Sequence, residues 1–318
     1  MPSVVQIVTT RAPAAPRKPS PSPTPLAGDP ALEEFFRSLP SVPAATPRPT
    51  GSGVVIDAAG YVLTAAHIID QAETVTVRLA DGRALTASVV GSDRRSNVAL
   101  LKVPGSALTA APTGEARRLR LGERVFAAGM MFGKSPAVTD GIVSTAQLEE
   151  SNAAGHFQTT APLFPSMGGG PLFNLAGQVV GLNAMMYQRD TNSSLSYAIP
   201  IEDALAVAKE LRASGRVRRA TLGITLQEVT PMIAATYGMD KPAGVMVSTV
   251  LPGSPAAQAG IAMGDLLMRF GAEPLRSPIH ATQLLGRAKP GERLTIRVRR
   301  MKDVREEDVV ATLGEARD

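Results

Sequence analysis

The sequence predicts a mainly β protein with two domains. Its 318 residues are enough for about two domains of roughly 150 residues each. Between Gly51 and Asn183, short runs rich in β-branched residues alternate with Gly, Asp and Asn turns. Many short strands at regular spacing are typical of a β-sandwich or a β-barrel. Residues 217–313 again mix short strands with two helical segments, and this change of pattern predicts a second domain.

The chain begins with a strand and continues into a proline-rich segment. Ser3 to Thr10 is a β-branched run that predicts a first strand. Residues 11–50 hold eleven of the 26 prolines, a composition that buries too little apolar surface to become ordered. Within them, Asp29 to Arg37 could form one or two helical turns. Its paired Phe35 and Phe36 are either a docking point or a packed remnant of a loop.

Three further helices and one tight turn follow from local signals. Ala80 to Arg83 predicts a hairpin turn. Glu202 to Ser214 has apolar residues at helical spacing and a stop at Gly215. Ser254 to Gly260 has a Ser N-cap with Pro at the first helical position. The last helix is predicted at about Ser277 to Arg287.

Composition excludes several classes of function. The net charge is +5, but no basic cluster is interleaved with aromatic residues, so we expect no nucleic-acid partner. There is no Cys, which removes disulfides, thiol catalysis and Cys-ligated zinc. No apolar run is long enough to span a membrane, and the first residues lack the features of a signal peptide. His156 and His280 lack metal-ligand spacing, so we expect no metal and no cofactor, although a metal site that includes His67 stays open.

Three short runs carry the chemistry of the first domain. They are Leu63-Thr-Ala-Ala-His67, Asp93-Arg-Arg-Ser-Asn97-Val-Ala-Leu-Leu-Lys102 and Pro165-Ser-Met-Gly168-Gly-Gly-Pro-Leu-Phe-Asn174. Each resembles a triad motif of the HtrA family of trypsin-fold proteases, and together they are in register with it. The resemblance implies a trypsin-like double six-stranded β-barrel. His67 takes the place of the general base, which accepts the proton of the nucleophile in such a triad.

Two of the three triad positions carry a different residue. Asn97 stands where the family has its orienting aspartate, and Gly168 stands where it has the nucleophilic serine. Asp93 matches another aspartate of the motif and does not replace Asn97. Thr160 also stands where the family usually has Asp. An amide can bond to imidazole but carries no charge to stabilise imidazolium, and glycine offers no nucleophile.

The resemblance also implies a peptide cleft around these positions. The backbone N–H groups of Ser166 and Gly168 match the oxyanion-hole donors of the family. Leu163 and Met186 fall where the family lines an apolar specificity pocket, although both could equally be core residues. Ser166 is two residues from the aligned nucleophile, so a relocated serine is disfavoured, because small misplacements already slow such reactions greatly.

The second domain resembles an HtrA-type PDZ domain. The run Gly244 to Leu267 contains the motif V-x-P-G-S-P-A-x-x-A-G in the sequence VLPGSPAAQAG, and Asp265 follows it. PDZ domains bind a peptide C-terminus by adding a strand to a sheet edge. The resemblance assigns the carboxylate loop to Thr221, Leu222, Gly223 and Ile224, and the facing helix to Ile279, Gln283 and Leu284. The departure is Arg269-Phe270-Gly271, where the turn is expected to differ.

These observations predict an HtrA-like pseudoprotease. Residues 1–212 would form the protease domain, with the proline-rich loop at 11–50, and residues 213–318 the PDZ domain. It would bind unfolded or C-terminal peptides of other proteins as a homotrimer or a mixed oligomer with an active homologue. The alternative is a serine endopeptidase with a relocated nucleophile. By resemblance the location is periplasmic or otherwise extracytoplasmic, whereas a genuine start at Met1 would indicate the cytoplasm.

Overall fold

The computed structural model describes residues 1–10, 50–105, 108–131, 135–145, 155–184 and 196–316. The predicted loop at 11–50, with its short helix at Asp29 to Arg37, therefore lies almost entirely outside the described residues. The chain divides into two compact units. The first contains Met1–Ala146 and Phe157–Gly215, and the second contains Arg216–Asp318.

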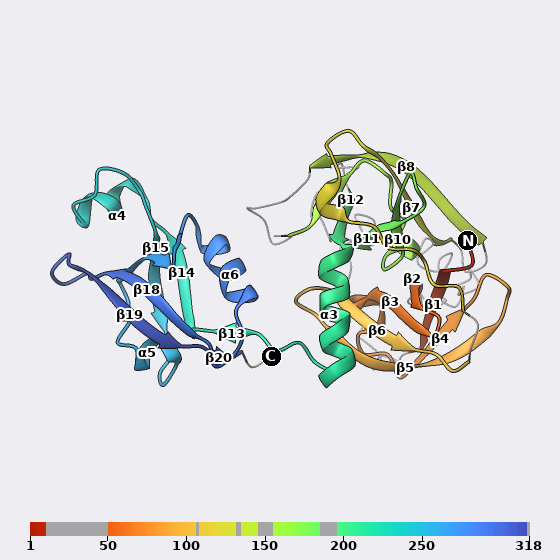
Figure 1. The fold of residues 1–318 in the computed structure, drawn as a ribbon, viewed down its shortest axis with the longest axis horizontal. Coiled ribbons are helices and arrows are strands. Elements are labelled where there is room, and N and C mark those ends of the chain that lie inside the picture. Colours follow the sequence, from red (N-terminus) through yellow and green to blue (C-terminus); the bar gives the residue numbers. More distant parts are fainter. Residues whose placement is uncertain (11–49, 106–107, 132–134, 146–154, 185–195, 317–318) are drawn as a thin grey trace, which may run out of the picture. The chain divides into compact units, whose positions relative to one another are not determined.

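Two closed six-stranded barrels make up the first unit, which confirms the predicted double barrel (Figure 1). The first barrel has the strand order β1-β2-β3-β6-β5-β4, and the second has β10-β11-β12-β9-β8-β7. The first barrel consists of β1 (Val4–Thr10), β2 (Thr50–Asp57), β3 (Tyr61–Ala65), β4 (Thr74–Arg78), β5 (Ala84–Asp93) and β6 (Val98–Lys102). The second consists of β7 (Arg124–Met131), β8 (Ser135–Thr145), β9 (Phe157–Thr159), β10 (Pro171–Asn174), β11 (Val179–Ala184) and β12 (Ser196–Pro200).

Alternation along the strands fills each barrel with small apolar side chains. Val5 and Ile7 of β1 belong to the core of the first barrel and are fully buried. Gln6, which lies between them, is buried too, because β1 also contacts β7 of the second barrel. The second core is built around Val125, Phe157 and Leu172. Closure removes the free sheet edges that would otherwise pair with another chain.

Short helices connect and cover the barrels. The short helix α2 (Ala66–Ile69) directly follows β3, and two 3₁₀ turns lie at η1 (Ala116–Arg118) and η2 (Pro165–Met167). The predicted helix at Glu202 to Ser214 is α3 (Ile201–Ser214), and it ends at Gly215 in the left-handed region, with φ 73°. Its buried face packs on β5, β6, β11 and β12, so it lies along both barrels (Figure 1).

The second unit is an antiparallel sheet with three helices. Its sheet has the order β14-β15-β16-β18-β19, with β17 paired to β16, and β13 pairs separately with β20. The strands are β13 (Ala220–Thr221), β14 (Ile224–Glu228), β15 (Val245–Val250), β16 (Leu266–Phe270), β17 (Glu273–Pro274), β18 (Arg293–Arg299), β19 (Glu306–Thr312) and β20 (Gly314–Glu315). The helices are α4 (Pro231–Thr236), α5 (Pro255–Gln258) and α6 (Pro278–Arg287).

The helices of this unit begin where the sequence places caps. Ser254 and Ser277 cap α5 and α6 through their hydroxyl oxygens, with Pro at the first helical position. Helix α4 was not predicted, although Thr230-Pro231 carries the same signal and the Thr230 hydroxyl accepts from Ile233 N at 3.3 Å. In the part of the chain that the structure describes, no helix has the length and apolarity needed to cross a membrane.

Candidate functional site

His67 and Asn97 meet at the edge of the first barrel. His67 is exposed in α2, and its Nδ1 lies 2.9 Å from Asn97 Oδ1. The same oxygen accepts the backbone N–H of His67 at 3.1 Å. Because an amide oxygen only accepts hydrogen bonds, Nδ1 carries a proton in this contact, and Nε2 faces away from Asn97. The imidazole is therefore held by a neutral amide and not by the charged carboxylate of an aspartate.

Gly168 lies directly in front of this imidazole. A Cβ atom placed on Gly168 would be 3.6 Å from His67 Nε2 and 3.5 Å from the carbonyl oxygen of Pro165, which are ordinary contacts. Its backbone, with φ −55° and ψ 137°, is open to any residue. A serine at this position would therefore fit and would face His67. The structure brings the three expected triad positions together, and the expected nucleophile position carries no side chain.

The two glycines that follow are different. Gly169 has φ 75°, and a Cβ there would be 2.5 Å from Thr64 Oγ1 and 2.6 Å from the oxygen of Ser52. A Cβ on Gly170 would be 2.3 Å from the oxygen of Ala128. Close approach of neighbouring backbone requires glycine at both positions. Gly168 alone in the run is not required by packing.

The turn before Gly168 is closed on itself. Met167 N donates to Phe164 O at 2.8 Å, and Gly168 N points at Pro165 O at 3.5 Å. One of the two expected oxyanion-hole donors is therefore directed at an oxygen of its own loop. The other expected donor belongs to Ser166, whose carbonyl accepts from Ser52 Oγ at 2.7 Å. Met167 is fully buried in the second core, where it anchors the loop.

The remaining expected residues of the cleft have separate surroundings. Leu163 is half-buried and packs on the second core, which favours the core alternative for this side chain. Met186 lies outside the described residues. Asp93 accepts Ser96 N at 2.8 Å and so holds the turn that precedes Asn97. Thr160 Oγ1 accepts Ile142 N at 3.0 Å.

In the second unit, an edge strand and a helix define the expected peptide groove. β14 is the edge of its sheet, and α6 contacts it (Figure 1). The loop before β14 includes Gly223, with φ 70°, where a Cβ would be 2.4 Å from Ser254 Cβ. Gly223 N donates to Thr221 Oγ1 at 3.0 Å. A bound carboxylate would therefore compete with a hydroxyl for this amide.

The predicted groove residues divide between groove and core. Leu222 is fully buried, so only its backbone could contact a peptide. Leu284 is partly buried and packs on the core of this unit. Ile279 and Gln283 are half-buried on α6. His280, expected to be a surface or packing residue, is half-buried, and its Nδ1 is buried with no hydrogen-bond partner among the described residues.

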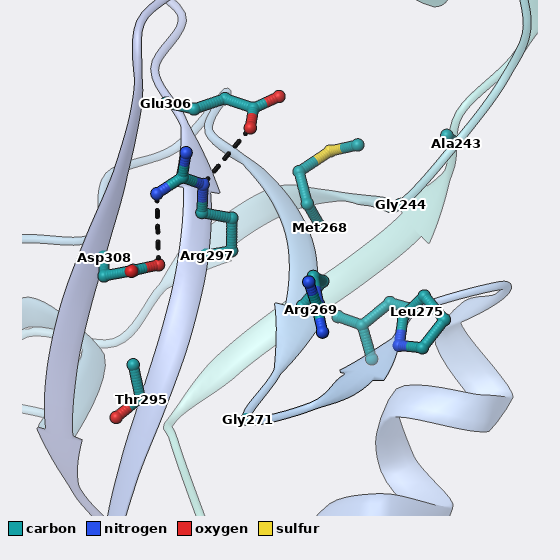
Figure 2. A pocket seen from close by; sticks show the side chains of 11 residues that line it. Ala243, Gly244, Met268, Arg269, Gly271, Leu275, Thr295, Arg297, Glu306 and Asp308 are labelled. Atoms are coloured by element: carbon teal, nitrogen blue, oxygen red, sulfur yellow. Dashed lines mark hydrogen bonds and ion pairs between the residues drawn. The ribbon is translucent and has the colours of Figure 1, made fainter.

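A second hollow of the same unit lies between β16, β17, β18 and β19. Its volume is about 540 Å³. Figure 2 shows Arg297 held between Glu306, at 3.2 Å, and Asp308, at 3.4 Å. Arg269 donates to Ala272 O at 2.8 Å. This bond stabilises the turn that follows Arg269, where the sequence departs from the family pattern.

No metal centre is formed by the residues that the structure describes. No group of three His, Cys, Asp or Glu side chains lies close enough together among them to hold an ion. His67 has a single protein partner, the amide of Asn97, in this part of the chain.

The geometry defines a class of protein: a trypsin-like peptidase barrel joined to a PDZ domain. Family models agree, because the trypsin-like peptidase domain matches residues 51–182 and the PDZ domain matches residues 246–300. Two relatives bear the name "Probable periplasmic serine endoprotease DegP-like". One, from Ectopseudomonas mendocina, is 39% identical over 90% of this chain and 62% of its own length. The other, from Pseudomonas savastanoi pv. phaseolicola, is 39% identical over 83% of this chain and 55% of its own length.

Solved structures extend the likeness to the whole chain. An HtrA-type protease AlgW with decapeptide superposes with a TM-score of 0.80 at 28% identity, covering 100% of this chain and 96% of that one. A serine endoprotease from Yersinia pestis has a TM-score of 0.74 at 27% identity, covering 99% and 95%. The chain belongs to the HtrA family. It spans only 55% to 62% of the length of the two DegP-like relatives.

Proposed function

We propose that this protein binds peptides without cleaving them through a serine acyl-enzyme. The observation that carries the proposal is the pair of replacements on either side of one imidazole, Asn97 behind His67 and Gly168 in front of it. A nucleophile must lie within hydrogen-bond reach of its base, and Gly168 has no side chain. The barrel keeps the shape of the family and lacks the group that forms the covalent intermediate.

The PDZ domain supplies the proposed peptide receptor. The free edge of β14 can add an extended peptide as a further strand, with main-chain hydrogen bonds giving affinity. The half-buried Ile279 and Gln283 of α6 and the loop from Thr221 to Ile224 are the proposed contacts. The ligand class is the C-termini or unfolded segments of other proteins, and the role is quality control or regulation by a scaffold subunit.

A relocated nucleophile is the alternative. Ser166 is the candidate, but its carbonyl accepts a hydrogen bond from Ser52 Oγ, whereas its hydroxyl has no hydrogen-bond partner among the described residues. Within the described ranges no hydrogen bond joins His67 Nε2 to a serine or threonine hydroxyl. This arrangement favours binding over catalysis.

Unfolded casein separates the two possibilities. The purified protein should leave casein intact over hours while binding it in a pull-down. Time-dependent cleavage that His67→Ala abolishes would contradict the proposal and would establish the endopeptidase. Cleavage that survives His67→Ala would indicate a contaminating protease.

The proposed organisation places the protease-like domain at residues 1–212 and the PDZ domain at residues 213–318. The helix α3 ends at Ser214, so this boundary falls in its last turn. We also propose a periplasmic location, because relatives 39% identical carry that word in their names. Fractionation of cells that express the full gene tests the location directly.

An apolar surface on the second barrel supports the proposed oligomer. A hollow of about 420 Å³ there is lined by Met1, Phe126, Val138, Phe173 and Leu175, among others. Leu175 is 70% exposed and Val138 48% exposed, and contiguous apolar surface of this kind marks interaction sites. The proposed occupant is a second copy of this chain in a homotrimer, or an active homologue in a mixed oligomer.

Charge introduced on this surface should break the assembly. Leu175→Asp should convert the oligomer to monomer in light scattering, whereas Leu121→Asp, at a 66% exposed leucine that does not line the hollow, should not. A monomeric wild type that stays monomeric when mixed with a homologue would contradict the proposal.

A further inference from the structure

We propose that the cleft beside His67 binds the free C-terminal carboxylate of a peptide. This inference rests on the proposed function, because it names the ligand class of the same cleft. It goes further because a single ligand, a carboxylate, accounts for both Asn97 and Gly168. Loss of catalysis would need only one of these two residues. The ligand resembles the acid product of a proteolytic cleavage.

Space for the ligand exists in front of the imidazole. Among the residues that the structure describes, no atom outside the two chain neighbours of Gly168 lies closer than 3.5 Å to the position of a Cβ, and His67 Nε2 lies 3.6 Å from it. A serine hydroxyl would occupy the volume between that position and the imidazole. With glycine, the same volume can hold a carboxylate oxygen within hydrogen-bond reach of Nε2, since such bonds span about 2.7–2.9 Å.

The charge of the cleft also favours an anion. An aspartate at position 97 would bind the imidazolium from behind and repel an anion in front of it. Asn97 holds the ring by the same bond, at 2.9 Å, and carries no charge. The positive charge of a protonated His67 is then left for the ligand. Both replacements therefore change the cleft in the same direction, toward accepting an anion.

The surrounding acids do not cancel this effect. Asp70 forms an ion pair with Arg94, and Asp93 is 6% exposed and accepts from Ser96. Arg94 thus offsets the charge of Asp70, and Asp93 is buried and directed at the Ser96 amide. The added negative charge of a ligand meets a histidine whose protein partner is neutral.

The backbone amide of Gly168 can supply a further donor. Its contact with Pro165 O is 3.5 Å, longer than the usual N–H···O range of about 2.7–3.2 Å. A carboxylate is a stronger acceptor than a carbonyl, because bonds to ionised groups are roughly twice as strong. The ligand can therefore recruit this amide at small cost to the loop.

Histidine NMR can locate the ligand, because the chain has three histidines. The full chain is labelled with ¹⁵N-histidine, and His67→Gln assigns the His67 signal. It is titrated with N-acetyl-Ala-Ala-Pro-Val as the free acid and, separately, as the C-terminal amide. His280 on α6 reports on the PDZ domain in the same spectra. The acid should shift the His67 imidazole with an affinity at least about tenfold tighter than the amide, which corresponds to about 1.4 kcal/mol.

Two variants separate the contribution of charge from that of volume. Asn97→Asp should weaken binding of the acid at His67 by about tenfold, through like-charge repulsion. Gly168→Ser should weaken it by filling the volume. Thr86→Asp adds the same charge at an exposed position of β5 and should leave the affinity unchanged.

The outcomes separate this inference from the proposed function. If acid and amide shift His67 equally, the cleft accepts internal peptide segments, and the inference is wrong while peptide binding in the cleft stands. If only His280 responds, binding is confined to the PDZ domain and the inference is wrong. If Asn97→Asp strengthens binding of the acid, the role assigned to charge is overturned.

Discussion

The barrel cleft and the PDZ groove each contain a glycine at a key position, and the two glycines have opposite characters. Gly223 of the PDZ loop has φ 70° and would place a Cβ 2.4 Å from Ser254, so its backbone demands glycine. Gly168 of the barrel has an ordinary backbone and room for a side chain. Gly223 is needed for the shape of its loop, whereas Gly168 stands where the family resemblance expects a serine nucleophile. The PDZ loop is therefore constrained by its packing, whereas the backbone at Gly168 can accept a side chain.

Restoring the two side chains of the cleft should change activity most. The double variant Asn97→Asp with Gly168→Ser should cleave casein at a measurable rate. Gly168→Ser alone should be slower by about 10⁴-fold, the cost of an amide in place of the orienting carboxylate in a serine triad. Initial rates with a fluorescent casein measure the ratio.

The double variant also tests the loop itself. A double variant as inert as the wild type would show that the turn closed by Gly168 N and Pro165 O blocks catalysis independently of the missing side chains. The difference between cleft and groove would then lie in backbone geometry as well as in side chains.

Adjacent glycines should respond differently to the same methyl group. Gly169→Ala combines a positive φ with contacts of 2.5–2.6 Å and should lower the free energy of unfolding by about 2–4 kcal/mol. Gly168→Ala should be neutral or stabilising by about 0.4–1 kcal/mol. Guanidinium unfolding followed by circular dichroism measures both. Equal losses at the two positions would contradict the view that Gly168 is free of packing constraints.

The same contrast exists within the PDZ domain. Gly223→Ala should weaken peptide binding and lower the stability of this unit by about 1–3 kcal/mol, because its Cβ meets Ser254. Gly286 lies in α6 with open space around it, so Gly286→Ala should stabilise by about 0.5–1 kcal/mol. Calorimetry with a C-terminal peptide gives the affinity of each variant, and undiminished binding by Gly223→Ala would place the carboxylate loop elsewhere.

A smaller effect should be a loss of stability at low pH that is confined to the PDZ domain. A hydrogen bond from Arg300 holds the pKa of Glu307 below its ordinary value of 4.5. The folded state gains stability from this pair above that ordinary value and loses it as the pH falls through the lower folded-state pKa. Glu307→Gln should flatten the decline of the unfolding midpoint below pH 4.5. A decline unchanged by the substitution would assign it to other carboxylates.

The fold followed from sequence patterns wherever those patterns are local. Alternating strands, the Gly215 stop after α3 and the Ser-Pro cap of α5 each act over a few residues, and the sequence predicts each of them. The sequence also predicts the range of α6, whose Ser-Pro cap appears in the structure. The sequence pattern does not indicate helix α4, because six residues show little helical periodicity, although the helix has a Thr-Pro start.

The sequence predicts which residues form the candidate site but not how their side chains and amides are oriented. The motifs placed His67, Asn97 and Gly168 in one site, and the structure brings them together. The direction of the Gly168 amide depends on a turn fixed by Ser52 and by burial of Met167, which lie on different strands and loops. The buried Nδ1 of His280 likewise arises from packing, which spacing along the chain does not reveal.

Reaction with a fluorophosphonate decides whether the cleft holds an activated nucleophile. The reagent forms a covalent adduct with an activated serine, so the variant with both Asn97→Asp and Gly168→Ser serves as the positive control. We expect intact-mass spectrometry to find an adduct on this variant, mapped by peptide digestion to the substituted position 168, and no adduct on the wild-type protein. A stoichiometric adduct on Ser166 of the wild-type protein that His67→Ala removes would show that the cleft is a working serine protease site.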